Sequence, residues 1–357
     1  MHLDVKTLNE PEEYLRYIRR KGLFIAGLAI GLVVLCIVAM AIGSSYIPVQ
    51  EIAAAFLSAD QGNVPGIIMN VRLPRVLAAV VAGAGLAAAG VVMQSVLRNP
   101  LSSPYTMGVS HAAAFGAAFA ITALGAGSLS HLLSDAVVIR NPYIVTICAF
   151  VGAMLATAGL LLVARYRSSQ PEVLILVGVA LAALFTAGIT FLQYFSSADQ
   201  IAAIVFWTFG DVGRATWGDL ALIALVVLPS IGYFLASRWD YNAIDAGDET
   251  AHSLGIHVER VRTVAMLLSS LITAVVVSFL GIIGFIGLVS PHVMRRIIGG
   301  DQRYLLPASC IGGAILLLGA DMVARIIIAP AVLPVGVLTA FLGAPLFIYL
   351  LVGRRTQ

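Results

Sequence analysis

The sequence predicts an all-α polytopic membrane protein with about ten transmembrane helices. The chain has 357 residues, of which 60% are hydrophobic and 11% are charged, and its mean hydropathy is +0.99. A soluble domain carries about a quarter charged residues and cannot bury this much apolar surface. In lipid, only helices and closed barrels satisfy every backbone polar group. Because the apolar runs are long and continuous rather than alternating, they favour helices over a barrel.

The apolar runs divide the chain into a short N-terminal segment, 1–21, and a ten-helix domain, 22–355. Pro11 is placed for the first turn of a helix in the N-terminal segment. The first apolar run is long enough to cross a bilayer, so we expect an uncleaved helix rather than a signal peptide. The expected spans are about 22–43, 73–97, 107–126, 142–164, 172–195, 218–237, 263–281, 282–298 (broken by Pro291), 304–328 and 334–352.

Three other segments lie between the spans. Residues from Pro48 to Leu57 form a short amphipathic piece. The apolar piece 200–210 is too short to cross and is expected to re-enter the membrane. The longest polar insertion, 238–262, follows the sixth span.

The basic residues predict which side of the membrane each loop faces. Cytoplasmic loops carry an excess of Lys and Arg. With the N-terminus in the cytoplasm and alternating spans, most of the 21 Lys and Arg residues fall on the cytoplasmic side. We therefore expect both termini in the cytoplasm and the chain in the inner, cytoplasmic membrane of the cell. Five arginines remain on the outer side: Arg72, Arg75, Arg140, Arg214 and Arg325.

The sequence shows no sign of catalytic chemistry. It contains no Walker A motif, no nucleophile elbow and no cluster of His, Cys, Asp or Glu at ligand spacing. We expect no catalytic residue, no metal site and no cofactor. A secondary transporter would need ionisable residues within the spans, and a membrane-embedded enzyme would need clustered polar residues at one face. These are the alternatives to a transport permease whose energy enters from a partner.

Short motifs at the helix ends carry a family resemblance. They are Arg72-Leu73-Pro74-Arg75, Asn99-Pro100-Leu101, Gly108-Val109-Ser110, the run from Gly284 to His292, the run from Ala320 to Arg325, Leu333-Pro334-Val335-Gly336 and the run from Leu342 to Pro345. In their order and spacing, from about residue 25 to residue 355, they resemble those of the FecCD-type permeases of type II ABC importers. That family takes up ferric siderophores, haem and vitamin B12.

The resemblance implies partners as well as a fold. It implies a homodimer, two ATP-binding cassette ATPase subunits on the cytoplasmic face and an extracytoplasmic substrate-binding protein, with no nucleic acid. The ATPase would lie on a separate subunit, and this chain would be a transport subunit rather than an enzyme. An iron–siderophore or similar metal chelate is the leading cargo, and vitamin B12 and haem are the alternatives.

The outer arginines gain a function from the resemblance. Arg72, Arg75 and Arg325 match family positions that pair with glutamates of the binding protein. A guanidinium suits this because its planar fork holds a carboxylate bidentately. One alternative is interfacial contact with lipid headgroups. For Arg325 a second alternative is an i,i+4 pair with Asp321.

The insertion at 238–262 resembles the loop that carries the family's coupling helix, which transmits the motion of the ATPase. An acidic residue at 248 or 249 can begin this helix and Gly255 can end it. The alternative is an ordinary solvated loop helix. The residues expected to couple to the ATPase are Asp248, Glu249, Ala251, Leu254 and Gly255.

Two further groups of residues are predicted by resemblance. The cytoplasmic gate comprises Asn99, Leu101, Ser168 and Ser169, with simple packing turns as the alternative. The lining of the pathway comprises Gln193, Tyr194, Phe206 and Trp207, in a region that continues through Thr208 and Gly210 to Asp211. For Tyr194 and Trp207 the alternative is an aromatic belt at the outer interface.

Overall fold

The computed structural model describes residues 11–43, 46–57, 63–129, 137–139, 141–166, 171–329 and 331–352. Within these ranges the chain is helical, apart from loops and one antiparallel hairpin of β1 (Gly127–Leu129) and β2 (Val137–Ile139). The helices are α1 (Pro11–Ala41), α2 (Val49–Leu57), α3 (Asn63–Ile67), α4 (Leu73–Val96), α5 (Val109–Thr122), α6 (Pro142–Tyr166), α7 (Pro171–Tyr194), α8 (Ala198–Thr208), α9 (Trp217–Ala236), α10 (Arg238–Asp245), α11 (Asp248–Ser253), α12 (Val258–Leu280), α13 (Ile286–Ile298), α14 (Gln302–Ile326) and α15 (Val335–Val352).

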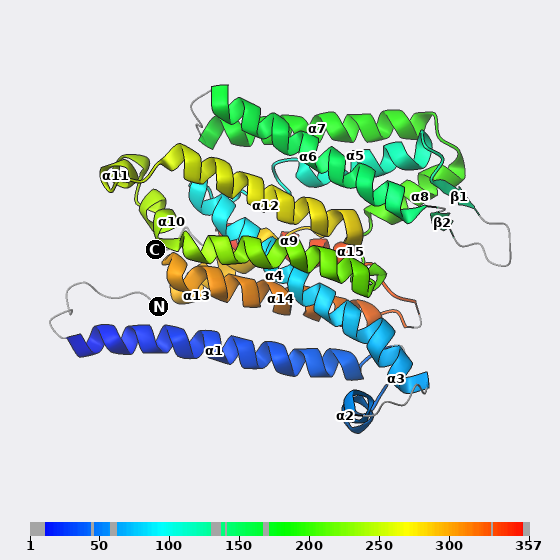
Figure 1. The fold of residues 1–357 in the computed structure, drawn as a ribbon, viewed down its shortest axis with the longest axis horizontal. Helices are drawn as coiled ribbons and strands as arrows, with labels where there is room; N and C mark the ends of the chain where they lie inside the picture. Colours follow the sequence, from blue (N-terminus) through cyan, green and yellow to red (C-terminus); the bar gives the residue numbers. More distant parts are fainter. Residues whose placement is uncertain are drawn as a thin grey trace.

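Most of the long helices run roughly along one direction, and α4 crosses them obliquely (Figure 1). The short helices α10 and α11 lie at one end of the bundle, and α2, α3, α8 and the hairpin lie at the other end (Figure 1). This arrangement confirms the predicted all-α, polytopic fold class.

The helix lengths match a membrane. Among the described residues, seven helices are long and apolar enough to cross it. A helix rises about 1.5 Å per residue, so about 20 residues cross a hydrocarbon core of about 30 Å. The other three expected spans correspond to α5, α13 and α15, which have 14, 13 and 18 residues. The expected re-entrant piece is α8, with 11 residues.

Helix α4 lies in the middle of the bundle. Of the apolar stretch within Val64–Val96, 78% is buried inside the chain, against 11% for the corresponding stretches of α1 and α7. Gly83 approaches the carbonyl group of Gly313 in α14, and a Cβ at Gly90 would overlap the carbonyl oxygen of Gly287 in α13. Small residues allow such close approach where no hydrophobic effect holds helices together. The glycines of span two are therefore packing positions.

The second span begins earlier than predicted. Its start was expected at Leu73, but α3 and a π-helical turn, Ile68–Arg72, run directly into α4. The amide of Leu73 donates to the carbonyl of Ile68, five residues back, which is the wide hydrogen-bonding pattern of a π turn. Pro74 follows this turn, at the first positions of α4. Arg72 and Arg75 consequently lie within a continuous helical segment.

The eighth span was predicted to break at Pro291, but the break lies earlier in the chain. Helix α13 is continuous through Pro291, and the break precedes it at 281–285, between Gly281 (φ 76°) and Phe285 (φ 66°). A proline leaves the carbonyl four residues before it without its helical donor. Here that carbonyl belongs to Gly287, and the side chain of Gln94 donates to it at 3.3 Å. A polar side chain of α4 thus repairs the helix where lipid offers no donor.

The contact of α4 with α13 generates a stability prediction. Gly90→Val should lower the free energy of unfolding by about 1–3 kcal/mol, because an added side chain forces the two backbones apart. The matched control is Gly27→Val on α1, where nothing lies within 4 Å of an added Cβ. Thermal unfolding in detergent measures both. An unchanged midpoint for Gly90→Val would contradict this packing.

Candidate functional site

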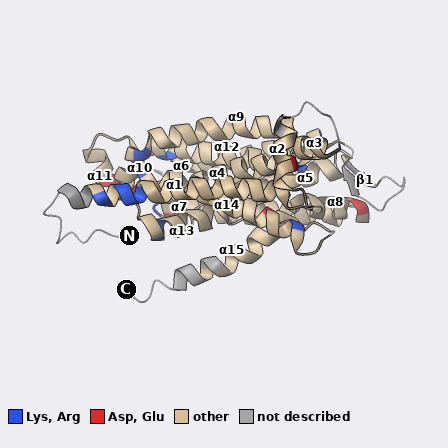
Figure 2. Cartoon of the chain, turned by 90° about the horizontal axis from the view of Figure 1, so that it is seen from below, with Lys and Arg blue, Asp and Glu red and all other residues tan. Residues whose placement is uncertain are grey.

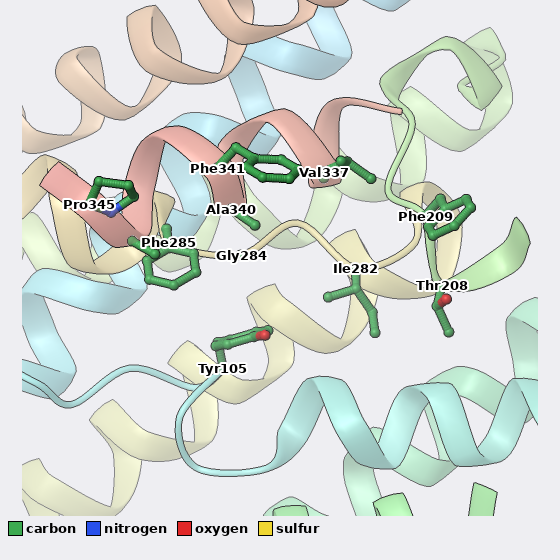
Figure 3. A pocket seen from close by; sticks show the side chains of 12 residues that line it. Tyr105, Thr208, Phe209, Ile282, Gly284, Phe285, Val337, Ala340, Phe341 and Pro345 are labelled. Atoms are coloured by element: carbon green, nitrogen blue, oxygen red, sulfur yellow. The ribbon is translucent and has the colours of Figure 1, made fainter. Parts of the chain in front are cut away.

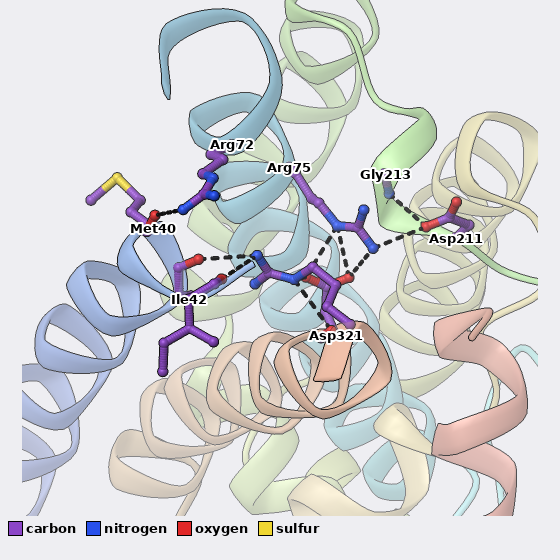
Figure 4. Close-up of polar contacts among 9 residues, drawn as sticks. Met40, Ile42, Arg72, Arg75, Asp211, Gly213 and Asp321 are labelled. Atoms are coloured by element: carbon purple, nitrogen blue, oxygen red, sulfur yellow. Dashed lines mark hydrogen bonds and ion pairs between the residues drawn. The ribbon is translucent and has the colours of Figure 1, made fainter. Parts of the chain in front are cut away.

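A cluster of arginines and aspartates (Figure 4) lies where α4 begins and α14 ends, at the end of the bundle that carries α2 and α3 (Figure 1). Its centre is Asp321 of α14, whose side chain is fully buried. Arg75 of α4 donates to both carboxylate oxygens of Asp321, with a shortest N–O distance of 2.7 Å. Arg325, one turn further along α14, lies 3.1 Å from Asp321 Oδ2. Asp211 also contacts Arg75, at 3.5 Å. One buried carboxylate therefore pairs with two guanidinium groups.

The same cluster closes the end of α1. The last four carbonyl groups of a helix lack intrahelical donors. Arg72 donates to the carbonyl oxygens of Met40 and Ala41 at 2.6 and 3.0 Å. Arg325 donates to those of Ala39 and Ile42 at 3.1 and 2.8 Å. Cationic side chains at a helix C-terminus also interact favourably with its dipole, so these two arginines fasten α1 to α4 and α14.

The structure thus brings together the three arginines predicted to dock a binding protein. Arg72 and Arg325 are each only 6% exposed, and Arg75 is largely buried. The alternative partner considered for Arg325, Asp321, is the partner it has. Asp211, in the region predicted to line the pathway, contacts Arg75 and accepts from the amide of Gly213. Docking by these arginines stays a prediction, and it would require a partner to compete with the bonds they already form.

At the opposite end of the bundle, α11 is attached by ion pairs. Asp248 begins α11 and accepts hydrogen bonds from Arg262 of α12 at 3.1 and 3.2 Å. Arg98, which follows α4, lies 3.8 Å from Asp248. Arg262 also donates to the carbonyl oxygen of Val96 at the end of α4, at 2.8 Å. Helix α11 is therefore tied both to α12 and to the end of α4.

The other predicted coupling residues divide into two groups. Glu249 and Leu254 are exposed, Leu254 by 67%, and Gly255 follows with a φ of 80°. The helix ends where the sequence predicted. Ala251 is fully buried in a small apolar cluster with α10 and the start of α12. In this conformation Ala251 holds α11 against the bundle and does not present itself to a partner.

A polar network that the sequence did not predict joins α4, α10 and α14. Gln302 donates to Ser95 at 3.2 Å and to Asp245 at 2.8 Å, and Asn242 donates to Asp301 at 3.1 Å. Burial by itself raises the pKa of Asp301. The hydrogen bonds from Arg303 and Asn242 lower it by more, so the pKa of Asp301 lies below its usual value. In the sequence, the only sign of these hydrogen bonds is that polar residues occur at the helix ends. That pattern does not predict which residues bond to one another.

The predicted gate is described only in part. Asn99 accepts a hydrogen bond from the amide of Leu101 at 2.8 Å, so the loop after α4 forms a tight turn held by an Asx side chain. Leu101 is exposed. Ser168 and Ser169 lie outside the described residues. The gate stays a prediction.

An apolar cavity of about 500 Å³ opens beside α15 (Figure 3). Its lining comes from the break between α12 and α13, from the end of α8, from α15 and from the loop before α5. Tyr105, Phe209, Phe285 and Phe341 supply aromatic surface. No residue of this lining carries a formal charge.

The four residues predicted to line the pathway do not line this cavity. Tyr194 is 83% exposed at the end of α7, Phe206 is exposed and Gln193 is half-buried. Trp207 is 4% exposed and packs in the apolar core around α5 and α6. Its neighbour Thr208 reaches the cavity instead. Helix α8 turns the Trp207 side chain inward in this conformation, and its place in the pathway lining stays a prediction.

A model of the FecCD transport family matches residues 31–353. The chain belongs to the FecCD transport family. It is 50% identical over 341 residues to a Methanocaldococcus jannaschii protein named as an ABC transporter permease, covering 96% of this chain and 97% of the relative. It is 36% identical to the hemin transport system permease protein of Yersinia pestis, covering 92% and 97%. It is 38% identical to the Fe(3+)-citrate import system permease protein of Bacillus subtilis, covering 93% and 96%.

A solved structure has the same fold. It is described as an inward-facing conformation of a transporter of the metal-chelate ABC type, and its TM-score is 0.79 with 31% identity, covering 92% of this chain and 99% of that chain. This FecCD-family chain is a multi-pass membrane permease of the ABC importer class. Membership favours transport over the secondary-transporter and enzyme alternatives.

The buried carboxylate of the arginine–aspartate cluster generates the second prediction. Asp321→Asn should lower the free energy of unfolding by about 3–5 kcal/mol, because it leaves Arg75 and Arg325 without their buried countercharge. Glu51→Gln removes a carboxylate from an exposed position on α2 and is the matched control. Thermal unfolding in detergent measures the effect. Equal midpoints for the two variants would mean that the cluster does not hold this end together.

Proposed function

We propose that two copies of this chain form the membrane pathway of an importer for an iron–siderophore or similar metal chelate, driven by two ATPase subunits. The observation that carries the proposal is the attachment of α11. A short helix outside the bundle, with exposed Glu249 and Leu254, is ion-paired through Asp248 to α12 and to the residues that follow α4. A force applied to α11 therefore reaches two central helices directly.

Charge supports the orientation in this proposal. Lys and Arg residues gather at the end of the bundle that carries α10 and α11 (Figure 2). Cytoplasmic ends of membrane proteins are richer in basic residues. We place the ATPase subunits and both termini on this side, and the binding protein at the end with the arginine–aspartate cluster.

The homodimer rests on helices that one chain leaves uncovered. Helix α7 buries only Leu174 and Gly178 within the chain, although it is 24 residues long. A second copy would cover this face and α15, and the cavity beside α15 would then lie at the dimer axis. The turn of Asn99 and Leu101, with Ser168 and Ser169, would close the cytoplasmic side of that axis.

The cargo is the finer part of the proposal. Relatives named for hemin and for Fe(3+)-citrate are 36% and 38% identical to this chain. Sequence identity therefore does not distinguish between these two cargoes. A cavity lined without formal charge favours passage of a bulky chelate and does not select one. Ferric siderophore leads, with haem and vitamin B12 as alternatives. Uptake of each radiolabelled chelate by proteoliposomes that contain the permease, its ATPase and its binding protein decides among them.

Coupling through α11 is tested at Gly255. Its φ of 80° disfavours residues with a Cβ by roughly 1–2 kcal/mol. Gly255→Val should displace the end of α11 and uncouple ATP hydrolysis from uptake. Gly255→Asn is the matched control, because asparagine tolerates this conformation. Hydrolysis and uptake are measured in the same proteoliposomes, and wild-type uptake by Gly255→Val would count against the coupling role.

Docking at the opposite end is tested with two substitutions of opposite expected effect. Arg75→Gln should weaken binding of the binding protein about fivefold, the value of an exposed ion pair. Asp321→Asn releases Arg75 and Arg325 from their internal partner and should strengthen binding. Glu51→Gln changes the net charge by the same amount as Asp321→Asn, at an exposed position of the same end, and is the control. Affinities are measured at low salt and below the unfolding temperature of each variant. If Asp321→Asn left affinity unchanged, the arginines would be structural only.

A further inference from the structure

A groove of about 740 Å³ runs between the last turns of α6 and the first turns of α12. Both helix ends lie where α10 and α11 are, at the basic end of the bundle (Figure 1). The floor of the groove is apolar and is formed by Ala158, Leu161, Leu162 and Val264. Its rim carries Arg165, Glu259, Arg260 and Thr263. The groove therefore changes from apolar to cationic along the helix axes.

The two arginines of this groove differ from others at the same end. Arg98, Arg262 and Arg303 each lie within 4 Å of a carboxylate. Within the part of the chain that the structure describes, no ion pair includes Arg165 or Arg260, although Glu259 lies on the same rim. The rim therefore has one positive charge in excess. Arg260 also lies in the first turn of α12, where the helix dipole repels a cation and attracts an anion.

We propose that this groove binds an anionic phospholipid from the leaflet on the α11 side of the membrane. Arg165 and Arg260 hold the phosphate, and one hydrocarbon chain lies along Leu161, Leu162 and Val264. Both helices are long and apolar enough to span a membrane, so the floor lies at the depth of lipid chains and the rim lies at headgroup level. The arginine fork suits a phosphate, and basic pockets between membrane helices on this side take anionic headgroups.

The shape of the groove argues for a lipid over other anions. A free phosphate would use the rim and leave the apolar floor uncovered. A zwitterionic lipid would fill the floor but bring its own cation to a rim that already has positive charge in excess. The volume lies within the range of about 300–1,000 Å³ that is typical of ligand sites. An anionic phospholipid satisfies both parts of the groove at once.

The test measures phosphatidylglycerol that stays with the protein. The full chain is purified from membranes of equal parts phosphatidylglycerol and phosphatidylcholine, and native mass spectrometry counts the retained lipids. Wild type should retain phosphatidylglycerol in preference. Arg165→Gln with Arg260→Gln should weaken its binding about twenty-fivefold, since each arginine near an anionic surface contributes roughly fivefold. Arg296→Gln, an exposed arginine at the same end of the bundle, is the control and should change nothing.

A second pair of variants tests the apolar floor. Ala158→Phe fills the groove and should reduce retention, whereas Leu155→Phe on the exposed side of the same helix should not. All these positions are exposed, so unchanged thermal unfolding in lipid-free detergent verifies the fold. Equal retention of phosphatidylcholine and phosphatidylglycerol, or full competition by glycerol phosphate, overturns the proposal. If the double arginine variant lost its ATPase subunit but still retained the lipid, the groove would be a protein contact. That result also overturns the lipid proposal.

Discussion

The ion pairs of Asp321 with Arg75 and Arg325 hold α1, α4 and α14 together at one end of the bundle. A buried carboxylate is destabilising in an apolar surrounding unless it is paired and hydrogen-bonded. Asp321 meets both conditions through Arg75 and Arg325, which come from different helices. Because Arg325 also binds the last carbonyl groups of α1, the same contact determines where α1 ends. One carboxylate thereby positions α1, α4 and α14 relative to one another.

Lipid imposes a second constraint, which is that every backbone group must find a partner within the protein. The break before α13 and the proline inside it would leave a carbonyl unpaired. Gln94 supplies the donor, and it reaches Gly287 only because the glycines of α4 and α13 let the two backbones approach closely. Small residues and one polar side chain therefore act together. Neither would be sufficient alone, since the donor needs the short distance.

Helix α4 connects the two polar ends of the bundle. Arg75 lies in its first turn, within the cluster around Asp321. At its other end, the carbonyl group of Val96 accepts from Arg262, and Arg98 pairs with Asp248 at the start of α11. The helix between these contacts is almost wholly buried. The two ends that we assign to the binding protein and to the ATPase are thus joined by one tightly packed element.

The sequence by itself determined the membrane class, the order of the helices, the short α8 and α11, and the family. The family follows from the resemblance of the motifs at the helix ends. The other features follow from the lengths of apolar runs and from local signals such as Gly255, because the lipid sets helix length and a positive φ selects glycine. Sequence reasoning also selected Arg72, Arg75 and Arg325, but from charge it predicted an exposed surface. Only the tertiary structure decided that they are buried and paired. Arg75 and Asp321 are 246 positions apart, and no local pattern specifies which helix ends meet. That is decided by the packing of α4 against α14, where side-chain shape across the whole interface selects the register.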